Sequence, residues 1–159
     1  TIRYNKQVNN QEDQFTHLST ELSLYYTPKL PIQLTAAVRL GAATNIGDYK
    51  FYQSNFLGGS TNLRGFRRTR FAGQSMMFSN TELRLEISEI RNYVFTGKWG
   101  LSGFVDSGRV WSDLRQSDEW HTSVGPGVWL NALELLVVSA NYGISEEGGF
   151  FNLRLGHFF

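Results

Sequence analysis

The sequence of 159 residues contains no cysteine and only three prolines, and its net charge is just +1. The absence of cysteine excludes disulfides and thiolate metal sites, and the small net charge argues against a nucleic-acid-binding surface. No run approaches the roughly eighteen apolar residues that a membrane helix requires, and no signal peptide is visible. Because Thr1 is not an initiator residue, we expect a processed or partial polypeptide.

Glycine, by contrast, is frequent at 16 residues, and aromatic residues make up 14% of the chain. Apolar and polar residues alternate with period two along most of the sequence, and helical periodicity is nearly absent. This pattern predicts an all-β chain of eight strands, one of them a shorter strand near residues 1–8. The other predicted strands cover residues 17–26, 32–40, 77–87, 99–106, 124–130, 136–142 and 151–159.

The alternation fits two kinds of fold. One is a soluble barrel or sandwich with its apolar face inward, and the other is a transmembrane antiparallel up-and-down β-barrel with its apolar face toward lipid. Several strands reach the about nine to eleven residues of a tilted membrane span, and the chain ends on Phe158-Phe159 inside a strand. The ionised residues also share the face opposite the apolar one: Arg39, Glu82, Arg84, Glu86, Asp106 and Arg154. We therefore predict a single membrane-barrel domain over residues 1–159.

The connection over residues 43–74 joins two of the predicted strands. A structureless connection of that length is uncommon in a compact domain and is usually functional. It carries a Gly58-Gly59 pair and then Arg64, which lies between Leu63 and Gly65-Phe66. Either this segment folds toward the barrel lumen and places the guanidinium there, or it is a solvated surface loop whose arginine has no specific role.

Catalysis finds little support in the sequence. His17, His121 and His157 are scattered without metal-ligand spacing, and no nucleophile elbow, phosphate loop or dinucleotide fingerprint occurs. We expect neither enzymatic activity nor a cofactor.

A combination of three charged residues is the stronger candidate for a site. Glu82 and Asp106 lie on adjacent predicted strands with the same inward parity, and Arg64 lies on the long connection. An arginine that reaches both carboxylates would form charge-assisted bonds, and removing one partner from a desolvated cluster costs about 3–5 kcal/mol. The alternative is that the three charges are hydrated independently.

Several short motifs follow one another in a fixed order from about residue 40 onward. They are Phe56-Leu57-Gly58-Gly59, Leu63-Arg64-Gly65-Phe66, Thr81-Glu82-Leu83-Arg84, Phe104-Val105-Asp106-Ser107-Gly108, Val110-Trp111 and the C-terminal Phe159. In this order they resemble the bacterial surface-antigen outer-membrane barrel family, the BamA/TamA superfamily, which includes two-partner secretion transporters.

The resemblance implies a sixteen-stranded barrel whose sixth extracellular loop carries an Arg-Gly-aromatic motif into the lumen. Residues 43–74 would be that loop. Arg64, Gly65 and Phe66 would be its motif, and Glu82 and Asp106 would be the acceptors on the wall of the lumen.

The last strand resembles the family's terminal recognition strand, which forms one side of the barrel seam. Its residues would include Phe151, Leu153, Leu155 and Phe159. The resemblance implies a protein of the bacterial outer membrane, with a periplasmic C-terminus, that assists insertion and assembly of other β-barrel proteins. Its partners would be the bilayer, client outer-membrane proteins, and accessory periplasmic proteins or POTRA domains. A polypeptide-secretion pore, a barrel anchor for another domain and a soluble lipid-binding barrel remain as alternatives.

The sequence departs from the family by lacking POTRA domains and the first half of the barrel. Eight strands enclose a lumen that side chains alone would nearly fill. We therefore expect these residues to be the C-terminal half of a sixteen-stranded barrel. A closed eight-stranded barrel, or a homodimer of two copies joined at their edges, are the other closures that leave no backbone unpaired in lipid.

Overall fold

The computed structural model describes residues 2–8, 15–29, 31–91, 96–112, 119–132 and 136–156. Its elements are β1 (Ile2–Val8), β2 (Phe15–Tyr26), β3 (Leu34–Gly47), the 3-10 helix η1 (Phe51–Gln53), β4 (Asn55–Leu57), β5 (Phe71–Gly73), β6 (Ser75–Arg91), β7 (Thr96–Trp111), β8 (His121–Ala132), β9 (Leu136–Ser145) and β10 (Gly148–Leu155). Within these ranges there is no helix long and apolar enough to cross a bilayer.

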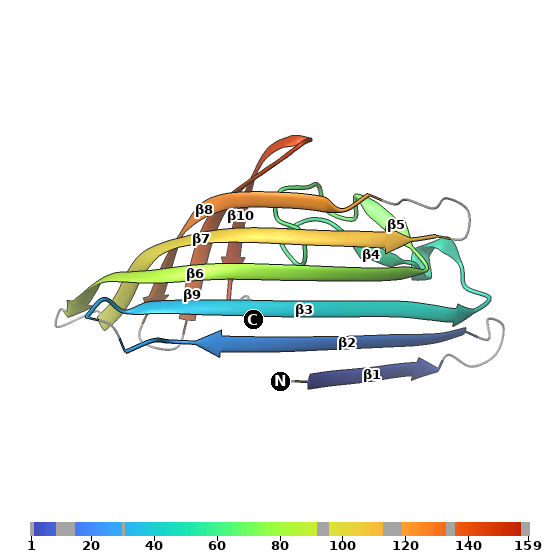
Figure 1. The fold of residues 1–159 in the computed structure, drawn as a ribbon, viewed down its shortest axis with the longest axis horizontal. Coiled ribbons are helices and arrows are strands. Elements are labelled where there is room, and N and C mark those ends of the chain that lie inside the picture. The colour runs from blue at the N-terminus through green and yellow to red at the C-terminus, as the bar shows by residue number, and fades with distance from the viewer. Residues whose placement is uncertain are drawn as a thin grey trace.

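Eight strands form one sheet in the order β1-β2-β3-β6-β7-β8-β9-β10, and each neighbouring pair is antiparallel. The predicted all-β, antiparallel, up-and-down architecture is thereby confirmed. Figure 1 shows that the sheet curves strongly, so that β9 and β10 lie behind β3, β6 and β7 in this view. β1 and β10 are the two edges of the sheet.

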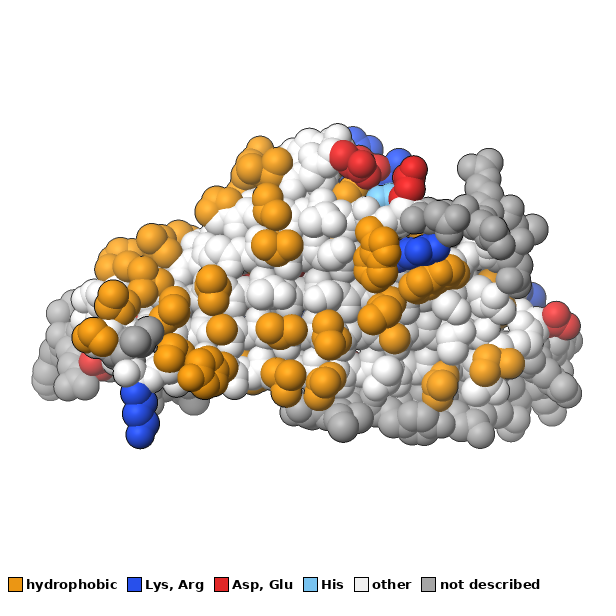
Figure 2. Space-filling model, viewed as in Figure 1, with side chains coloured by type: hydrophobic (Ala, Val, Ile, Leu, Met, Phe, Trp, Pro, Cys, Tyr) orange, Lys and Arg blue, Asp and Glu red, His pale blue; other side chains and the backbone are white. Residues whose placement is uncertain are grey.

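The two faces of the sheet differ in their chemistry. We call the face that carries Leu101 and Val105 the outer face, and the face that carries Phe104 and Asp106 the inner face. The two outer side chains are 46% and 48% exposed, whereas the two inner ones are 4% and 0% exposed. Figure 2 shows hydrophobic side chains spread over the outer face of the strands, with few charged groups among them. An open apolar face and an enclosed charged face are the reverse of a soluble barrel and are typical of a membrane barrel.

The long connection between β3 and β6 differs from its predicted form. β3 continues to Gly47, beyond the expected end of that strand, and the connection contains η1 and a two-stranded sheet of β4 and β5. Ala43 and Asn45 face inward and are buried. The alternation of inward and outward side chains therefore continues in this part of β3, where small residues made it hard to recognise from hydrophobicity. The structureless loop predicted over 43–74 is thus a shorter and partly ordered segment.

The last hairpin also differs from its prediction. The predicted strands 136–142 and 151–159 left a longer connection between them, but β9 and β10 extend to Ser145 and from Gly148, leaving a two-residue turn. Gly148 has a φ of +117°, a backbone conformation that glycine adopts without strain. β10 ends at Leu155, earlier than the predicted strand, and Gly156 follows with a φ of +101°. Phe159 and His157 lie outside the described residues.

Candidate functional site

A tight turn at residues 58–63 prepares the loop motif. Gly58 and Gly59 have φ angles of +125° and +86°, and a Cβ at Gly58 would lie 2.4 Å from the carbonyl oxygen of Arg67. The side chain of Asn62 holds the turn, because its Oδ1 accepts a hydrogen bond from the Gly58 amide at 2.8 Å and its Nδ2 donates to the Phe56 carbonyl at 3.1 Å. The Gly-Gly pair and Asn62 therefore fix the direction in which the next residue, Leu63, leads the chain.

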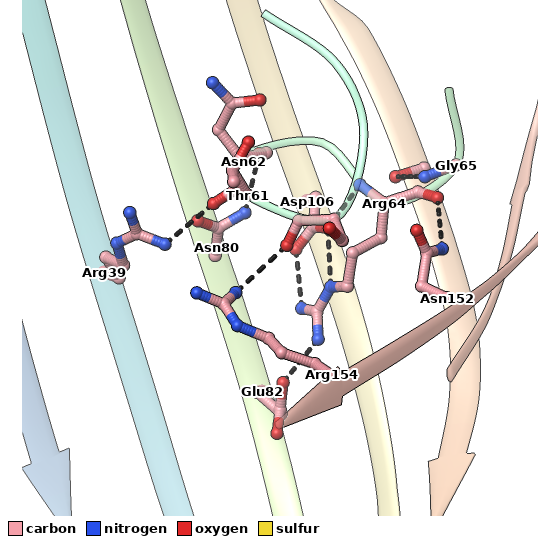
Figure 3. A network of polar contacts seen from close by, with 12 residues as sticks. Arg39, Thr61, Asn62, Arg64, Gly65, Asn80, Glu82, Asp106, Asn152 and Arg154 are labelled. Carbon is pink, nitrogen blue, oxygen red and sulfur yellow. Dashed lines mark hydrogen bonds and ion pairs between the residues drawn. The ribbon is translucent and has the colours of Figure 1, made fainter. Parts of the chain in front are cut away.

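The guanidinium of Arg64 lies between two carboxylates of the inner face (Figure 3). Its Nε and Nη2 donate to Oδ2 and Oδ1 of Asp106 at 2.8 and 2.7 Å, a bidentate pair, and its Nη1 donates to Oε2 of Glu82 at 2.5 Å. The Arg64 amide also donates to Asp106 at 3.0 Å. Glu82 receives a further bond from Nε of Arg84 at 2.7 Å. The structure therefore brings the three predicted charged residues together.

Desolvation sets the electrostatics of this cluster. Arg64, Glu82 and Asp106 are 1%, 5% and 0% exposed. Burial acts to lower the pKa of Arg64, but the hydrogen bonds and charges of Asp106 and Glu82 outweigh it and raise that pKa, so the guanidinium stays protonated. The guanidinium also lies 3.6 Å from the centroid of the Phe104 ring, a cation–π contact. One arginine thus bonds to both buried carboxylates, and Arg84 gives Glu82 a second positive partner.

The backbone next to the arginine is held by the last three strands. Nδ2 of Asn152, on β10, donates to the Arg64 carbonyl at 2.9 Å, and the Gly65 amide donates to Oγ of Ser123, on β8, at 3.1 Å. Oγ of Ser145, on β9, donates to the Gly65 carbonyl. A Cβ at Gly65 would lie 2.3 Å from that of Ser123, so only glycine fits at this position.

Two arginines extend the anchoring across the sheet. Nη1 of Arg39, on β3, donates to the Thr61 carbonyl at 2.9 Å, and Nη1 of Arg154, on β10, donates to the Ser60 carbonyl at 3.0 Å. Nδ2 of Asn80, on β6, donates to the carbonyl of Asn62 at 2.9 Å. We call residues 58–66 the docked loop, since its polar contacts run from β3 to β10.

Phe66 packs among apolar side chains and not in the charged cluster that holds Arg64. It packs in a hydrophobic cluster with Leu57, Leu63, Phe78 and Val110, and it is 1% exposed. Full burial of such side chains contributes about 1.5–3 kcal/mol each. The motif therefore anchors the docked loop both through charge and through an aromatic side chain.

The predicted seam residues lie on β10. Phe151, Leu153 and Leu155 are on the outer face and are 69%, 63% and 70% exposed. They are not part of the charged cluster. Asn152 and Arg154 alternate with them along the strand and make the contacts to the docked loop.

Sequence reasoning missed the amide and hydroxyl residues that hold the docked loop. Inward parity could have indicated the two asparagines of this group, which alternate with apolar outer residues in predicted strands, whereas the two serines lie just beyond the predicted strands. These residues are Asn80, Ser123, Ser145 and Asn152. Asn62 carried no such pattern, because its role depends on the path of the turn.

The geometry does not favour acid–base or metal chemistry. The two buried carboxylates are held by Arg64 and Arg84. Among the described residues, no group of three or more His, Asp or Glu side chains is arranged to hold a metal ion. The arrangement fixes a loop against a wall of strands.

An antiparallel sheet with an apolar exterior and a charged interior that holds a long loop defines an outer-membrane β-barrel domain. The sequence matches the Omp85 superfamily domain over residues 1–159, and the chain belongs to this superfamily. The predicted resemblance to the surface-antigen barrels is thereby confirmed. The superfamily comprises outer-membrane proteins that act in β-barrel insertion or in secretion, and its members are transporters and assembly factors, not enzymes. Searches of curated proteins and of solved structures gave no match.

The lipid-facing assignment of the outer face predicts a depth-dependent effect of charge. We expect Val105→Arg, near the middle of β7, to lower the free energy of unfolding by about 2–4 kcal/mol in a bilayer. Ile46→Arg, at the end of β3 and beyond the level of Trp111, serves as the matched control and should cost about 0–1 kcal/mol. Urea unfolding of the protein in lipid vesicles measures both values. Equal costs at the two positions would contradict the assignment.

Proposed function

We propose that this barrel assists the insertion and assembly of other β-barrel proteins in the outer membrane, as proteins of the BamA/TamA type do. The observation that supports this role is a short edge strand, β10, whose inward side chains bind the docked loop. In this proposal β10 is the strand that receives a client, and the docked loop holds it in position.

The short length of β10 favours a seam, that is, a pairing between the first and last strands of the barrel, that can open. β10 has eight residues, whereas β6 and β7 have 17 and 16. A shorter strand makes fewer ladder hydrogen bonds, so its pairing is weaker, and a strand edge offers backbone N–H and C=O groups to an incoming strand. A client strand would add to that edge by β-augmentation. The exposed apolar side chains of Phe151 and Leu153 would remain toward lipid throughout.

The docked loop ties this seam strand to the rest of the wall. Asn152 binds the carbonyl of Arg64, whose guanidinium is paired with Asp106 on β7. Arg154 binds the carbonyl of Ser60 in the same loop. Movement of β10 away from the sheet would break both contacts, so the loop stabilises the closed arrangement of the seam.

The orientation of the domain is part of the proposal. The connection between β3 and β6 would lie on the extracellular side, and the C-terminus would lie on the periplasmic side. Unfolded clients, and accessory periplasmic proteins or POTRA domains, would then approach the end of β10 that carries Leu155. In a sixteen-stranded barrel, further strands would pair with β1 and complete the wall.

Site-specific photo-crosslinking tests the proposal. The whole protein is reconstituted in vesicles with a benzophenone amino acid at Phe151 and is supplied with an unfolded outer-membrane protein. We expect client adducts at Phe151 and few at Leu83, an outer-face control on β6 that is similarly exposed. Adducts confined to an inner-face position such as Thr35 would instead indicate a polypeptide passing through the lumen, the secretion alternative. The absence of client adducts at all three positions would favour an anchor.

A further inference from the structure

A hollow of about 340 Å³ lies on the outer face, where β2, β3, β6 and β7 approach the long connections. The small residues Ala42, Thr44 and Ser75 contribute to its lining, together with larger side chains such as Met77 and Trp111. Its volume is at the lower end of the range of about 300–1,000 Å³ found for ligand sites. Because its lining is mainly apolar, it suits a hydrocarbon chain better than a polar molecule.

Strand register explains how the hollow forms. One row of cross-strand neighbours runs Leu18, Thr44, Ser75 and Trp111, and the next row runs Thr20, Ala42, Met77 and Arg109. The small side chains lie in β2, β3 and at the start of β6, and bulky ones border them: Leu18 and Trp111 in the first row, and Met77 in the second. The second row ends in a basic residue, Arg109, next to the hollow.

Arg109 belongs to the outer face although it is charged. Its neighbours Gly108 and Val110 are buried on the inner side, and its guanidinium lies 4.9 Å from the ring centroid of Trp111, the last residue of β7. The side chain therefore extends toward the end of the strand, as basic side chains do when they reach from the hydrocarbon region to the headgroup level. In Figure 2, basic atoms lie directly beside hydrophobic groups near this end of the outer face.

We propose that this hollow and Arg109 bind one anionic phospholipid, with an acyl chain in the hollow and a phosphate that no headgroup cation balances at the guanidinium. Guanidinium binds phosphate through two parallel charge-assisted bonds, and an apolar recess in contact with that charge matches the two parts of such a lipid. The bilayer supplies the occupant, since the chain belongs to an outer-membrane family. The inference holds whether the barrel inserts clients or secretes them.

Fluorescence quenching by brominated lipids tests the site. The whole protein is placed in phosphatidylcholine nanodiscs that contain increasing amounts of phosphatidylglycerol with brominated chains. The fluorescence of Trp111 is obtained by subtracting the fluorescence of a Trp111→Phe variant from that of the wild type. We expect half-maximal quenching at about tenfold less brominated phosphatidylglycerol than brominated phosphatidylcholine. Arg109→Gln should remove this preference, and Ala42→Leu, which fills the hollow, should weaken binding of both lipids by about tenfold.

Matched controls separate the site from general effects. Arg67→Gln removes an exposed charge from the long connection, and Ala140→Leu enlarges a small side chain elsewhere on the outer face; neither should change the quenching. Should Arg109→Gln fail to fold, Arg109→Lys keeps the charge but loses the bidentate geometry, and it should reduce the preference in part. Equal quenching by the two lipids in the wild type, or full binding by Ala42→Leu, would overturn the proposal. Relief of quenching by soluble glycerol phosphate at the same concentration would also overturn it, because it would show an anion site that needs no acyl chain.

Discussion

Replacing Arg64 with alanine is expected to lower the free energy of unfolding by about 3–5 kcal/mol. The substitution leaves Glu82 and Asp106 buried without the guanidinium that now bonds to both. It also removes the cation–π contact with Phe104. Urea unfolding of the protein in vesicles measures the loss. We expect client insertion to fall with it, because the docked loop would no longer hold β10.

A double-mutant cycle separates this pairing from a general effect of truncation. Arg64→Ala and Asp106→Asn are measured singly and together, and we expect an interaction energy of about 1–3 kcal/mol. Arg64→Lys should remain well below wild type, because an ammonium cannot form the two parallel bonds to Asp106. Arg67→Ala, three residues along and exposed, should stay within about 0.5 kcal/mol of wild type. An interaction energy near zero would exclude the pairing as a source of stability.

Replacing Gly143 with alanine is expected to displace the docked loop while every charged side chain is kept. A Cβ at this position in β9 would lie 2.7 Å from the carbonyl carbon and oxygen of Arg64 and 2.8 Å from the Gly65 amide nitrogen. These are backbone atoms that cannot rotate away, so the loop must shift. Trypsin cleavage after the exposed Arg67 and Arg68 reports the shift, because cleavage requires local opening. A loss of about 1.4 kcal/mol in docking would raise the open population, and the cleavage rate, about tenfold.

Gly103→Ala provides the control for this experiment. Gly103 lies in the middle of β7, and a Cβ there meets nothing within 4 Å. Both variants make the same change of residue type in a strand, so they differ mainly in the contact with the loop. We expect wild-type cleavage for Gly103→Ala. Similar cleavage rates for the two variants would mean that the loop does not depend on its close approach to β9. Larger single-channel conductance of Gly143→Ala would report the same displacement in the lumen.

Period-two alternation was sufficient to predict much of the fold. In each predicted strand, alternation places the carboxylate on the face opposite the apolar side chains, so Glu82 and Asp106 are assigned to the same face. In the structure the curved sheet encloses that face. Parity, the adjacency of two strands and a long connection suggested the combination of these carboxylates with Arg64, but they left open whether the three charges were hydrated independently. These are local features, which a sequence displays directly.

The remaining contacts depend on features that alternation does not encode. Asn152 and Ser123 contact the loop because the sheet curves until β8 and β10 reach it, and curvature depends on twist and register along the whole sheet. Gly143 matters through a missing side chain, which no polarity pattern reveals. Phe66 also required the fold, because adjacency to Arg64 in sequence did not predict its separate place in the hydrophobic cluster.

The anchoring of the docked loop has a consequence for the order in which the domain matures. Arg64 and Asn152 are 88 positions apart in the chain, and Ser60 and Arg154 are 94 apart. Contacts between such distant positions form late, since chain entropy opposes them until the intervening hairpins exist. The bonds of Arg64 to Glu82 and Asp106 span only 18 and 42 positions and do not need the final hairpin. The contacts of the loop with β10 are therefore the last to form, and they mark the joining of the final hairpin.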